Sequence, residues 1–406
     1  MIYTFKDICT KIGSGATPSG GKEAYKGGEY ALVRSQNVLD YTFTTTGLAY
    51  INELQAKKLD GVKVESGDVL LNITGDSVAR ACIIPNEILP ARVNQHVAII
   101  RGNRKVVLNE YLLYFLQYNK QLLLSISQGG GTRSAITKKM IEDLEIDLPS
   151  IKEQEKVVSL LKSIDHKIEL NRQINDNLEQ QAQALYKSWF VDFEPFKEGE
   201  FVGSEVGEIP IGWTVVKLGE LTEIPKKNIN PQKFPDTIFK HYSLPACDNG
   251  LIPEYQTGKD IMSNKILLQN NTTLFSKLNP RIKRIWFTCE VQPNSICSTE
   301  FIPYRAKNET ESGYIFSIIN SDAFYASVMG CVNGATGSHQ RFHAEDTEDF
   351  LCSYNKEVVN EFSQHIDATL KQMHDLRHEN VKLALMRDTL LPKLMSGELK
   401  INEIDC

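Results

Sequence analysis

Three short polar segments in the first third of the chain carry side chains that can form hydrogen bonds with base edges. Arginine can bond guanine through two donors, and asparagine or glutamine can bond adenine through a donor and an acceptor. The side chains in question are Arg34, Gln36 and Asn37 in the first segment, Thr74, Asp76 and Arg80 in the second, and Arg92, Asn94 and Gln95 in the third. These segments are candidates for base or phosphate contacts, with turn formation and capping as the alternative.

A glycine-rich stretch at residues 128–134 is a further candidate. Its glycines allow backbone amides to approach a phosphate, and Thr132 and Arg133 add donors. A glycine-rich turn without a ligand is the alternative.

The densest basic segment, residues 276–284, combines cations with an amide and a proline that prevents a regular helix. These features suit a loop that contacts the DNA backbone, whereas a solvated charged turn is the alternative. The candidates in this segment are Lys277, Asn279, Arg281, Lys283 and Arg284. On expected loops of the same half, we add His241, Tyr242, His339, Gln340 and Arg341.

Motifs for catalysis are incomplete. His339 and His343 have the spacing of a zinc site, but Gln340 stands where the catalytic glutamate of that motif would be. His374 and His378 share this spacing on an expected helix with no third ligand evident, so we interpret them as solvated or flanking a helix seam. We therefore expect no catalytic residue, no metal and no cofactor on this chain.

Composition describes an ordinary globular protein of two or three domains: 406 residues, 41% apolar and 24% charged. No run of 18 apolar residues occurs, and the first residues lack the apolar core of a signal peptide, so we expect a cytoplasmic protein. The eight cysteines are scattered without a CxxC pair, which indicates reduced thiols.

The net charge of −6 is concentrated in one place. Residues 191–212 hold six acidic residues against one lysine, whereas residues 1–140 hold 17 Lys and Arg against 11 Asp and Glu. The charge therefore permits contact with phosphates without proving it.

Two long helices are expected to position these segments. Apolar residues recur at alternating steps of three and four along residues 151–189 and again from residue 359 until Pro392. We expect the two seams to pack on each other as a coiled coil, with asparagines fixing the register; the alternative is that each helix packs on its own domain. The predicted seam comprises Leu161, Ile164, Ile168, Asn171, Asn175, Leu178, Leu185, Phe362, Ile366, Met373, Leu376, Asn380 and Leu383.

A mixed α and β domain precedes each helix. In the first we expect strands near residues 30–33, 68–73, 80–84 and 97–101 and one helix over 109–125. The beginning and end of the second domain repeat the apolar spacing and glycine-rich end of the first, which indicates an internal duplication in an α+β protein, although the interiors hardly resemble one another. The expected order is a domain (1–150), a helix (151–190), an acidic linker (191–212), a second domain (213–352), a second helix (353–398) and a tail (399–406).

Over nearly its whole length the sequence resembles the specificity subunits of type I restriction-modification systems. The resemblance rests on GDVLLNITGDSVARACIIP, ARVNQHVAIIR, FKHYSLPACDNG and SKLNPRIKRIWF, on the stretch from LPSIKEQEKVV to SWFVDFEPF, and on MRDTLLPKLMSGEL. Two departures stand out. Leu148-Pro149-Ser150 replaces the usual Pro-Pro, and the second repeat lacks the proline motif and the Glu-Gln pair, so its helix start is expected to differ.

The resemblance implies two target-recognition domains, each binding half of a split double-stranded DNA site, held apart by paired antiparallel helices. It also implies two methyltransferase (modification) subunits docked around the helices and translocating restriction subunits in the larger complex. S-adenosylmethionine, ATP and magnesium are then expected on those partners, with no membrane contact. The competing interpretation is a coiled-coil scaffold that assembles proteins without binding DNA.

Overall fold

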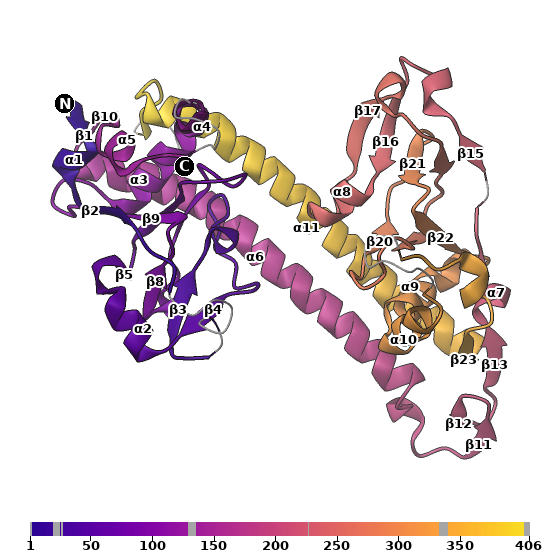
Figure 1. Ribbon diagram of the computed structural model, residues 1–406. Coiled ribbons are helices and arrows are strands. Elements are labelled where there is room, and N and C mark those ends of the chain that lie inside the picture. The colour runs from indigo at the N-terminus through magenta and orange to yellow at the C-terminus, as the bar shows by residue number, and fades with distance from the viewer. Residues whose placement is uncertain are drawn as a thin grey trace. The chain divides into compact units, whose positions relative to one another are not determined.

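The computed structural model describes residues 2–18, 25, 27–128, 135–225, 227–332 and 340–401. The chain forms two compact units: Met1–Lys167 with Leu383–Cys406, and Ile168–Lys382. Two helices of 40 residues, α6 (Ile151–Phe190) and α11 (Lys356–Met395), each contribute to both units (Figure 1). Each unit therefore contains part of both helices, whereas our division treated the helices as separate segments.

The first unit contains two four-stranded sheets, ordered β2-β9-β6-β7 and β4-β3-β8-β5, and an antiparallel pair β1-β10. Its strands are β1 (Ile2–Thr4), β2 (Cys9–Ser14), β3 (Tyr30–Val33), β4 (Ala49–Ile51), β5 (Lys63–Val64), β6 (Val69–Asn72), β7 (Ala81–Ile83), β8 (Ala91–Val93), β9 (Val97–Gly102) and β10 (Glu145–Asp147). Its helices besides α6 and α11 are α1 (Phe5–Ile8), η2 (Ser35–Asn37), η3 (Asp60–Val62), η4 (Asn86–Ile88), α2 (Glu53–Lys58), α3 (Asn109–Tyr118), α4 (Lys120–Gln128) and α5 (Lys138–Glu142). The four predicted strands are confirmed, but the single predicted helix over 109–125 is two helices.

The second unit contains the sheets β14-β22-β19-β20 and β15-β18-β21-β16-β17, and the pairs β13-β23 and β11-β12. Its strands are β11 (Phe201–Ser204), β12 (Gly207–Pro210), β13 (Thr214–Lys217), β14 (Thr222–Glu223), β15 (Asn228–Ile229), β16 (Ile238–Tyr242), β17 (Glu254–Thr257), β18 (Lys265–Leu267), β19 (Thr272–Ser276), β20 (Ile285–Thr288), β21 (Ser295–Ser298), β22 (Phe301–Ala306) and β23 (Leu351–Tyr354). Its helices besides α6 and α11 are η5 (Glu194–Phe196), α7 (Leu218–Leu221), η6 (Pro231–Lys233), α8 (Leu244–Asp248), η7 (Gly258–Asp260), η8 (Glu309–Glu311), α9 (Ser312–Asn320), α10 (Asp322–Gly330) and η9 (Ala344–Thr347).

The two units share one topology. In each, a sheet of four strands has the same order, and the second sheet pairs two strands in parallel, β3 with β8 and β16 with β21. The second unit only adds β15 at one edge. The predicted α+β class and internal repeat are confirmed, and the repeat extends through interiors whose sequences hardly resemble one another. Topology has persisted where the side chains have diverged.

The long helices pack on each other in the antiparallel sense. Within the second unit, the Trp189 and Phe362 rings lie 5.8 Å apart, and Asn171 bonds Asn380. As residue numbers rise along α6, those of their partners fall along α11. Of the predicted seam residues, eight are buried, and Leu178, Leu185, Leu376, Asn380 and Leu383 are partly buried.

The helices also belong to the cores of the units. In the first unit, Leu161 of α6 and Leu391 of α11 are buried in one cluster with Leu112 of α3. In the second, Phe362 of α11 is buried in a cluster with Tyr314 of α9. The two arrangements that the sequence left as alternatives therefore occur together.

Pro392 does not end the second helix, which corrects our prediction. α11 continues through Met395, with Pro392 exposed. The neighbouring Leu391 and Leu394 are both 4% exposed and anchor this last turn in the core of the first unit. Burial of these leucines offsets the hydrogen bond that proline cannot donate.

Both long helices follow a short strand and a capping residue. β10 pairs with β1 before Ser150, whose backbone N–H and hydroxyl both donate to Glu153. β23 pairs with β13 before Asn355, whose side chain accepts from the backbone N–H of Glu357 at 3.2 Å. The two starts therefore differ in the capping residue but have the same construction.

The predicted acidic linker is ordered. The antiparallel hairpin β11–β12 forms its second half. Phe190, Phe193 and Phe196 surround Trp213, with ring centroids 5.2 to 5.5 Å from the Trp213 ring. These aromatic residues close the end of α6.

The seven cysteines among the described residues are unpaired. Burial raises the pKa of the Cys82 and Cys352 thiols to about 12. Within the described ranges, no helix has the length and apolar content needed to cross a membrane.

Candidate nucleic-acid interface

Three loops of the first unit meet at one edge of its two sheets. They connect β3 to β4 through η2, β6 to β7, and β8 to β9. The Asn72 amide at the end of β6 donates to the carbonyl oxygens of Ser35 (2.9 Å) and Val38 (3.2 Å). The backbone N–H of Ile73 donates to the carbonyl of His96 at 3.0 Å. The three polar segments that the sequence singled out are therefore neighbours in space.

A chain of side-chain hydrogen bonds links two of these loops. Thr17 donates to Gln95 Oε1, and Gln95 Nε2 lies 2.8 Å from His96 Nε2. His96 Nδ1 in turn lies 2.6 Å from Thr74 Oγ1. Because an amide nitrogen can only donate, His96 accepts at Nε2 and carries its proton on Nδ1, from which it donates to Thr74. Gln95 is thereby held in one orientation although it is exposed.

The first polar segment mainly binds its own turn. Arg34 and Gln36 both donate to the carbonyl of Gly47, Gln36 at 3.1 Å. Asn37 is fully buried, and its amide donates to the carbonyl of Thr44 at 3.0 Å. Turn formation therefore accounts for Asn37, while Gln36 remains exposed.

Arg92 and Asn94 are corrections to our candidates. Arg92 lies in strand β8 and is 4% exposed; its Nη2 is 2.6 Å from Asp60 Oδ1, and its guanidinium lies 5.5 Å from the Tyr30 ring centroid. Asn94 is buried, and its side-chain oxygen accepts from the backbone N–H of His96 at 3.0 Å. Both have a structural partner that the sequence did not reveal.

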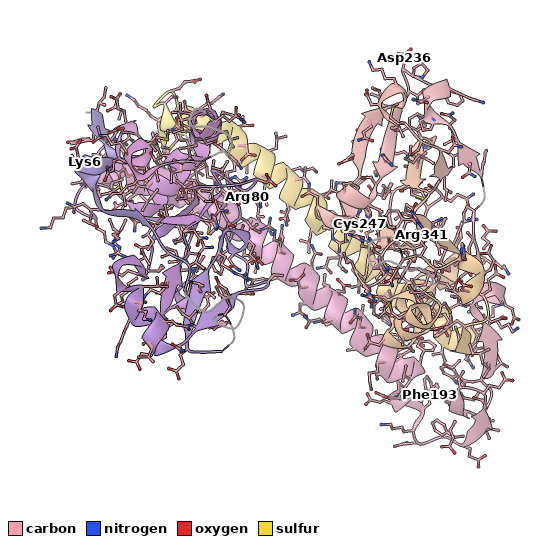
Figure 2. The ribbon with its side chains drawn as sticks, in the orientation of Figure 1. Lys6, Arg80, Phe193, Asp236, Cys247 and Arg341 are labelled. Atoms are coloured by element: carbon pink, nitrogen blue, oxygen red, sulfur yellow. The ribbon has the colours of Figure 1, made fainter. Side chains whose placement is uncertain are left out.

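Several other candidate side chains among the described residues remain accessible at this edge. Asp76 and Gln95 are exposed, and Thr74 and Arg80 are partly exposed; Figure 2 labels Arg80. These groups can donate and accept hydrogen bonds.

The second unit brings together the topologically equivalent loops. The predicted basic segment becomes the β19–β20 loop, the counterpart of the β6–β7 loop. The backbone N–H of Lys277 donates to the carbonyl of Glu300 in the β21–β22 loop at 2.9 Å. Arg284 forms two hydrogen bonds with the carboxylate of Asp248, which ends α8 after β16. The same three connections thus converge in both units.

Most cations at this second edge are already paired. Arg341, labelled in Figure 2, binds both oxygens of Glu300 at 3.0 and 3.1 Å. Lys283 Nζ donates to the carbonyl of Asn320 at 2.6 Å, and burial lowers the pKa of its ammonium. Arg281 is exposed, and Lys277 in the same loop is partly exposed. Arg281 is therefore the cation of this loop best placed to meet a phosphate.

Two amides lie where these loops meet. The backbone of Asn279 is left-handed (φ 49°), and its N–H donates to the carbonyl of Gln340 at 2.9 Å. The side-chain oxygens of both residues are buried without a hydrogen-bond partner among the described residues. The meeting point therefore holds two unused acceptors.

His241 and Tyr242 lie in strand β16 rather than on a loop, which corrects our prediction. His241 is 8% exposed, and its Nδ1 is 2.7 Å from Gln256 Oε1. Burial lowers the pKa of the His241 imidazole. Tyr242 is buried against Trp286. Neither is accessible to a nucleic acid at the loop edge.

Three candidates, Thr132, Arg133 and His339, lie outside the described residues. The residues that follow them pair with the candidate loops: Ala135 bridges to Thr74, and Arg341 bridges to Leu278. In each unit, the residues after the glycine-rich stretch therefore pair with the equivalent loop, β6–β7 in the first unit and β19–β20 in the second.

Sequence reasoning missed the partners that organise these loops. Asp248 and Glu300 hold the arginines of the second unit, and Thr17 and His96 orient Gln95. These contacts join segments that are distant in sequence or involve polar residues that are common everywhere. Residue spacing therefore could not predict them.

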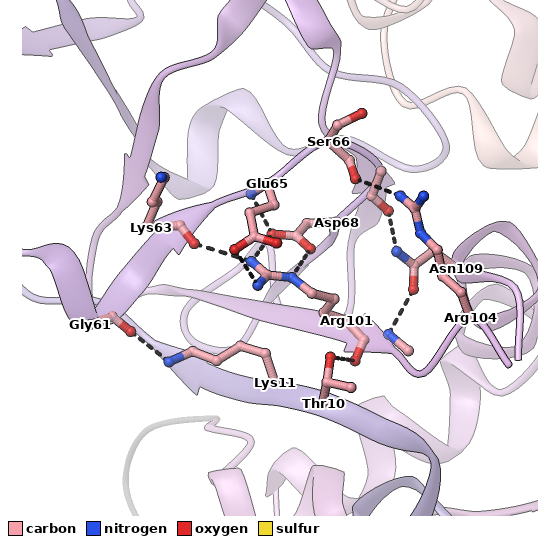
Figure 3. A network of polar contacts seen from close by, with 12 residues as sticks. Thr10, Lys11, Gly61, Lys63, Glu65, Ser66, Asp68, Arg101, Arg104 and Asn109 are labelled. Atoms are coloured by element: carbon pink, nitrogen blue, oxygen red, sulfur yellow. Dashed lines mark hydrogen bonds and ion pairs between the residues drawn. The ribbon is translucent and has the colours of Figure 1, made fainter. Parts of the chain in front are cut away.

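Arg101 stabilises the end of the β2-β9-β6-β7 sheet that lies away from the candidate loops. At the start of β6 and the end of β9, Arg101 bonds Asp68 through two nitrogens (2.7 and 2.8 Å) and pairs with Glu65 (Figure 3). These carboxylates raise the pKa of the Arg101 guanidinium, mainly through the Asp68 hydrogen bonds. A basic residue in this unit is therefore not evidence of phosphate contact by itself.

Comparisons with known proteins agree on one family. Residues 1–180 match the family described as Type I restriction modification DNA specificity domain. The MjaIX specificity subunit of a type I restriction enzyme from Methanocaldococcus jannaschii is 25% identical over 99% of this chain and 94% of its own length. The HindI specificity subunit from Haemophilus influenzae is 24% identical over 91% of this chain and 94% of its own length.

The fold has a counterpart among solved structures. The crystal structure of the type I restriction-modification S subunit from M. genitalium matches with a TM-score of 0.55 at 13% identity, covering 97% of this chain and 95% of that chain. At this identity the match supports the fold alone.

Proposed function

We propose that this chain is a specificity subunit of a type I restriction-modification system, similar to the relatives above, and that it selects the DNA site of a modification complex, each unit binding one half of a bipartite target. The observation that carries this proposal is the convergence of three polar loops in each unit, at the same edge of two sheets whose strand order is shared apart from the added edge strand β15. The sheets of the two units are alike and their loop residues differ, which is what binding to two different half-site sequences requires.

A DNA-shift assay with the modification partner present tests this function. The expected result is protection of a bipartite site, with two short specific sequences flanking an unspecific spacer. The competing scaffold function predicts complex formation with no sequence preference. Loss of preference in the wild-type complex would exclude the specificity role.

Catalysis and cofactors are assigned to partner chains. On this proposal, the methyl donor, ATP and magnesium belong to modification and restriction subunits, and this chain supplies binding alone. Donor crosslinking to the isolated chain would contradict that division.

Partner docking is proposed for the outer face of the long helices. In the first unit, Leu385 is 67% exposed and Met386 46% exposed on α11. Exposed apolar side chains on a helix surface are typical of protein interfaces. We expect Leu385→Glu with Met386→Glu to weaken co-purification of the modification subunit at least about tenfold while leaving the unfolding midpoint unchanged.

The matched control for docking is Lys393→Glu, another exposed position on the same helix. Partner binding by the double variant at wild-type strength would place docking elsewhere.

A further inference from the structure

A mixed cluster of ligand-type side chains lies in the second unit away from the candidate loops. Single ligand atoms of Glu290, His374 and Asp375 all lie within 4.8 Å of one another. His374 and Asp375 come from α11, and Glu290 comes from the β20–β21 turn. The third ligand that the helix sequence could not show is thus supplied by a segment more than 80 residues earlier.

Three features place the Glu290 carboxylate next to α11. Its backbone is left-handed (φ 51°), which is uncommon for a residue with a side chain. Lys240 Nζ donates to its carbonyl oxygen at 3.1 Å and holds the turn. Its carboxylate lies 3.8 Å from His374 Nε2. The turn therefore presents the carboxylate to the helix.

His378 adds a second imidazole one turn further along α11. Its ring centroid is 4.3 Å from that of His374, and its Nε2 is buried without a hydrogen-bond partner among the described residues. The two imidazoles therefore lie side by side on one face of α11.

Lys371 lies between the two carboxylates. Its Nζ lies 3.4 Å from Glu290 Oε1 and 3.6 Å from Asp375 Oδ2. Hydrogen bonding to Glu290 raises the pKa of this ammonium. A metal cation bound to the same carboxylates would have to displace it.

We propose that Glu290, His374 and Asp375 form a binding site for a divalent transition metal such as zinc, with His378 as fourth ligand after a change of rotamer. Two imidazoles and two carboxylates are ligands that zinc accepts. Two ligands spaced by four on a helix lie on one face, and Glu290 closes the site from a separate element. The metal would tie the β20–β21 turn to α11 within this unit.

Cobalt(II) binding to the full chain, stripped with EDTA, tests the site. We expect one Co²⁺ per chain with visible absorption, displacement by Zn²⁺, and a rise in the thermal midpoint with added Zn²⁺. His374→Gln and Asp375→Asn should each weaken binding at least about tenfold. Lys371→Met should tighten it about tenfold, since the competing ammonium is removed.

His166→Gln, an exposed histidine of α6, is the matched control and should bind Co²⁺ as the wild type does. Comparing metal-free unfolding midpoints of the variants separates loss of ligands from loss of fold, and Asp375, being exposed, is the safer substitution. Absence of stoichiometric binding, equal affinity in His374→Gln, weaker binding in Lys371→Met, or a thiolate charge-transfer band would each overturn the proposal.

Discussion

Several arginines that the sequence suggested for the interface are paired with carboxylates of their own unit, so cationic character alone does not identify DNA contacts. Arg284 and Arg341 are held by Asp248 and Glu300, and Arg92 is held by Asp60. On the proposed function, truncating such a residue would weaken DNA binding indirectly, through the loop that it stabilises. A useful test needs a cation that is exposed on the same loop.

Arg281→Ala is that test. Because Arg281 is exposed on the β19–β20 loop, we expect weaker binding and a slope of log K against log salt that is shallower by about 0.9, the value for one lost phosphate contact. Measurement is by fluorescence anisotropy of a specific duplex over a salt series, using the complex with its modification partner. Lys356→Ala removes the same charge at the start of α11 and should leave the slope unchanged. An unaltered slope in Arg281→Ala would exclude phosphate contact there.

A second residue-scale prediction concerns Asp367, where α11 packs against α9. Burial raises the pKa of this carboxyl to about 6, although both oxygens accept from the Ser312 hydroxyl at 3.1 Å. A carboxyl with a raised pKa in the folded state contributes stability at a pH below its ordinary value of 3.8. That contribution is lost as the pH rises through 6. At neutral pH the ionised group is therefore a cost to folding.

We expect Asp367→Asn to be more stable than the wild type by about 1–2 kcal/mol at pH 8, after allowance for partial solvent screening. The difference should fall toward zero at pH 4, where both side chains are neutral. Urea unfolding at the two pH values measures it, and Glu361→Gln, an exposed position on α11, is the control. A difference independent of pH would show that ionisation of Asp367 is not the cause.

At the scale of elements, the long helices were predictable because their periodic apolar pattern is local information. Strands β3 and β6 were found for the same reason. Arg92 pairs with Asp60, and Arg284 pairs with Asp248. Each pair joins separate segments, so composition could not show that these arginines have structural partners. The end of α11 was missed because tertiary burial of Leu394 overrides the local effect of proline.

The seam asparagines illustrate the same limit. The period showed that Asn171 and Asn380 lie on the seam, but only the structure shows that they bond each other at 2.9 Å. Asn171 also donates to Glu379 at 2.7 Å, and Asn380 donates to the carbonyl of Ile168 at 3.2 Å. These bonds fix one register of the two helices.

We expect Asn171→Ala and Asn380→Ala each to reduce the free energy of unfolding by about 1–2 kcal/mol, because a partly buried partner loses its hydrogen bond. The double variant should lose less than the sum of the two, which a double-mutant cycle by urea unfolding would show. Asn177→Ala, exposed on the same helix, is the control. Strict additivity would mean that the two amides do not interact in solution.

At the scale of the whole molecule, a repeated scaffold carries two unlike sets of loops. Strand order is retained in both units, yet the loop that offers Thr74 and Asp76 in one offers Lys277 and Arg281 in the other. On the proposed function, this division predicts that half-site sequence depends on the loops. It further predicts that the distance between half-sites depends on the helices, which are common to both units.

Helix length is the variable that tests this second dependence. Each long helix has 40 residues, which corresponds to about 60 Å at about 1.5 Å per residue. Insertions between Lys167 and Ile168 and between Lys382 and Leu383 fall at the division between units. Inserting whole heptads at both places preserves the seam.

We expect three heptads in each helix, about 32 Å, to lengthen the unspecific spacer by roughly one turn of duplex while leaving both half-site sequences unchanged. One heptad in each helix, about 10 Å, would instead place the half-sites on different faces of the DNA and weaken methylation. Sequencing the methylated bases in a host carrying each variant measures both effects. An unchanged spacer in the three-heptad variant would refute the helices as a ruler. Altered half-sites would show that loops and helices are not independent.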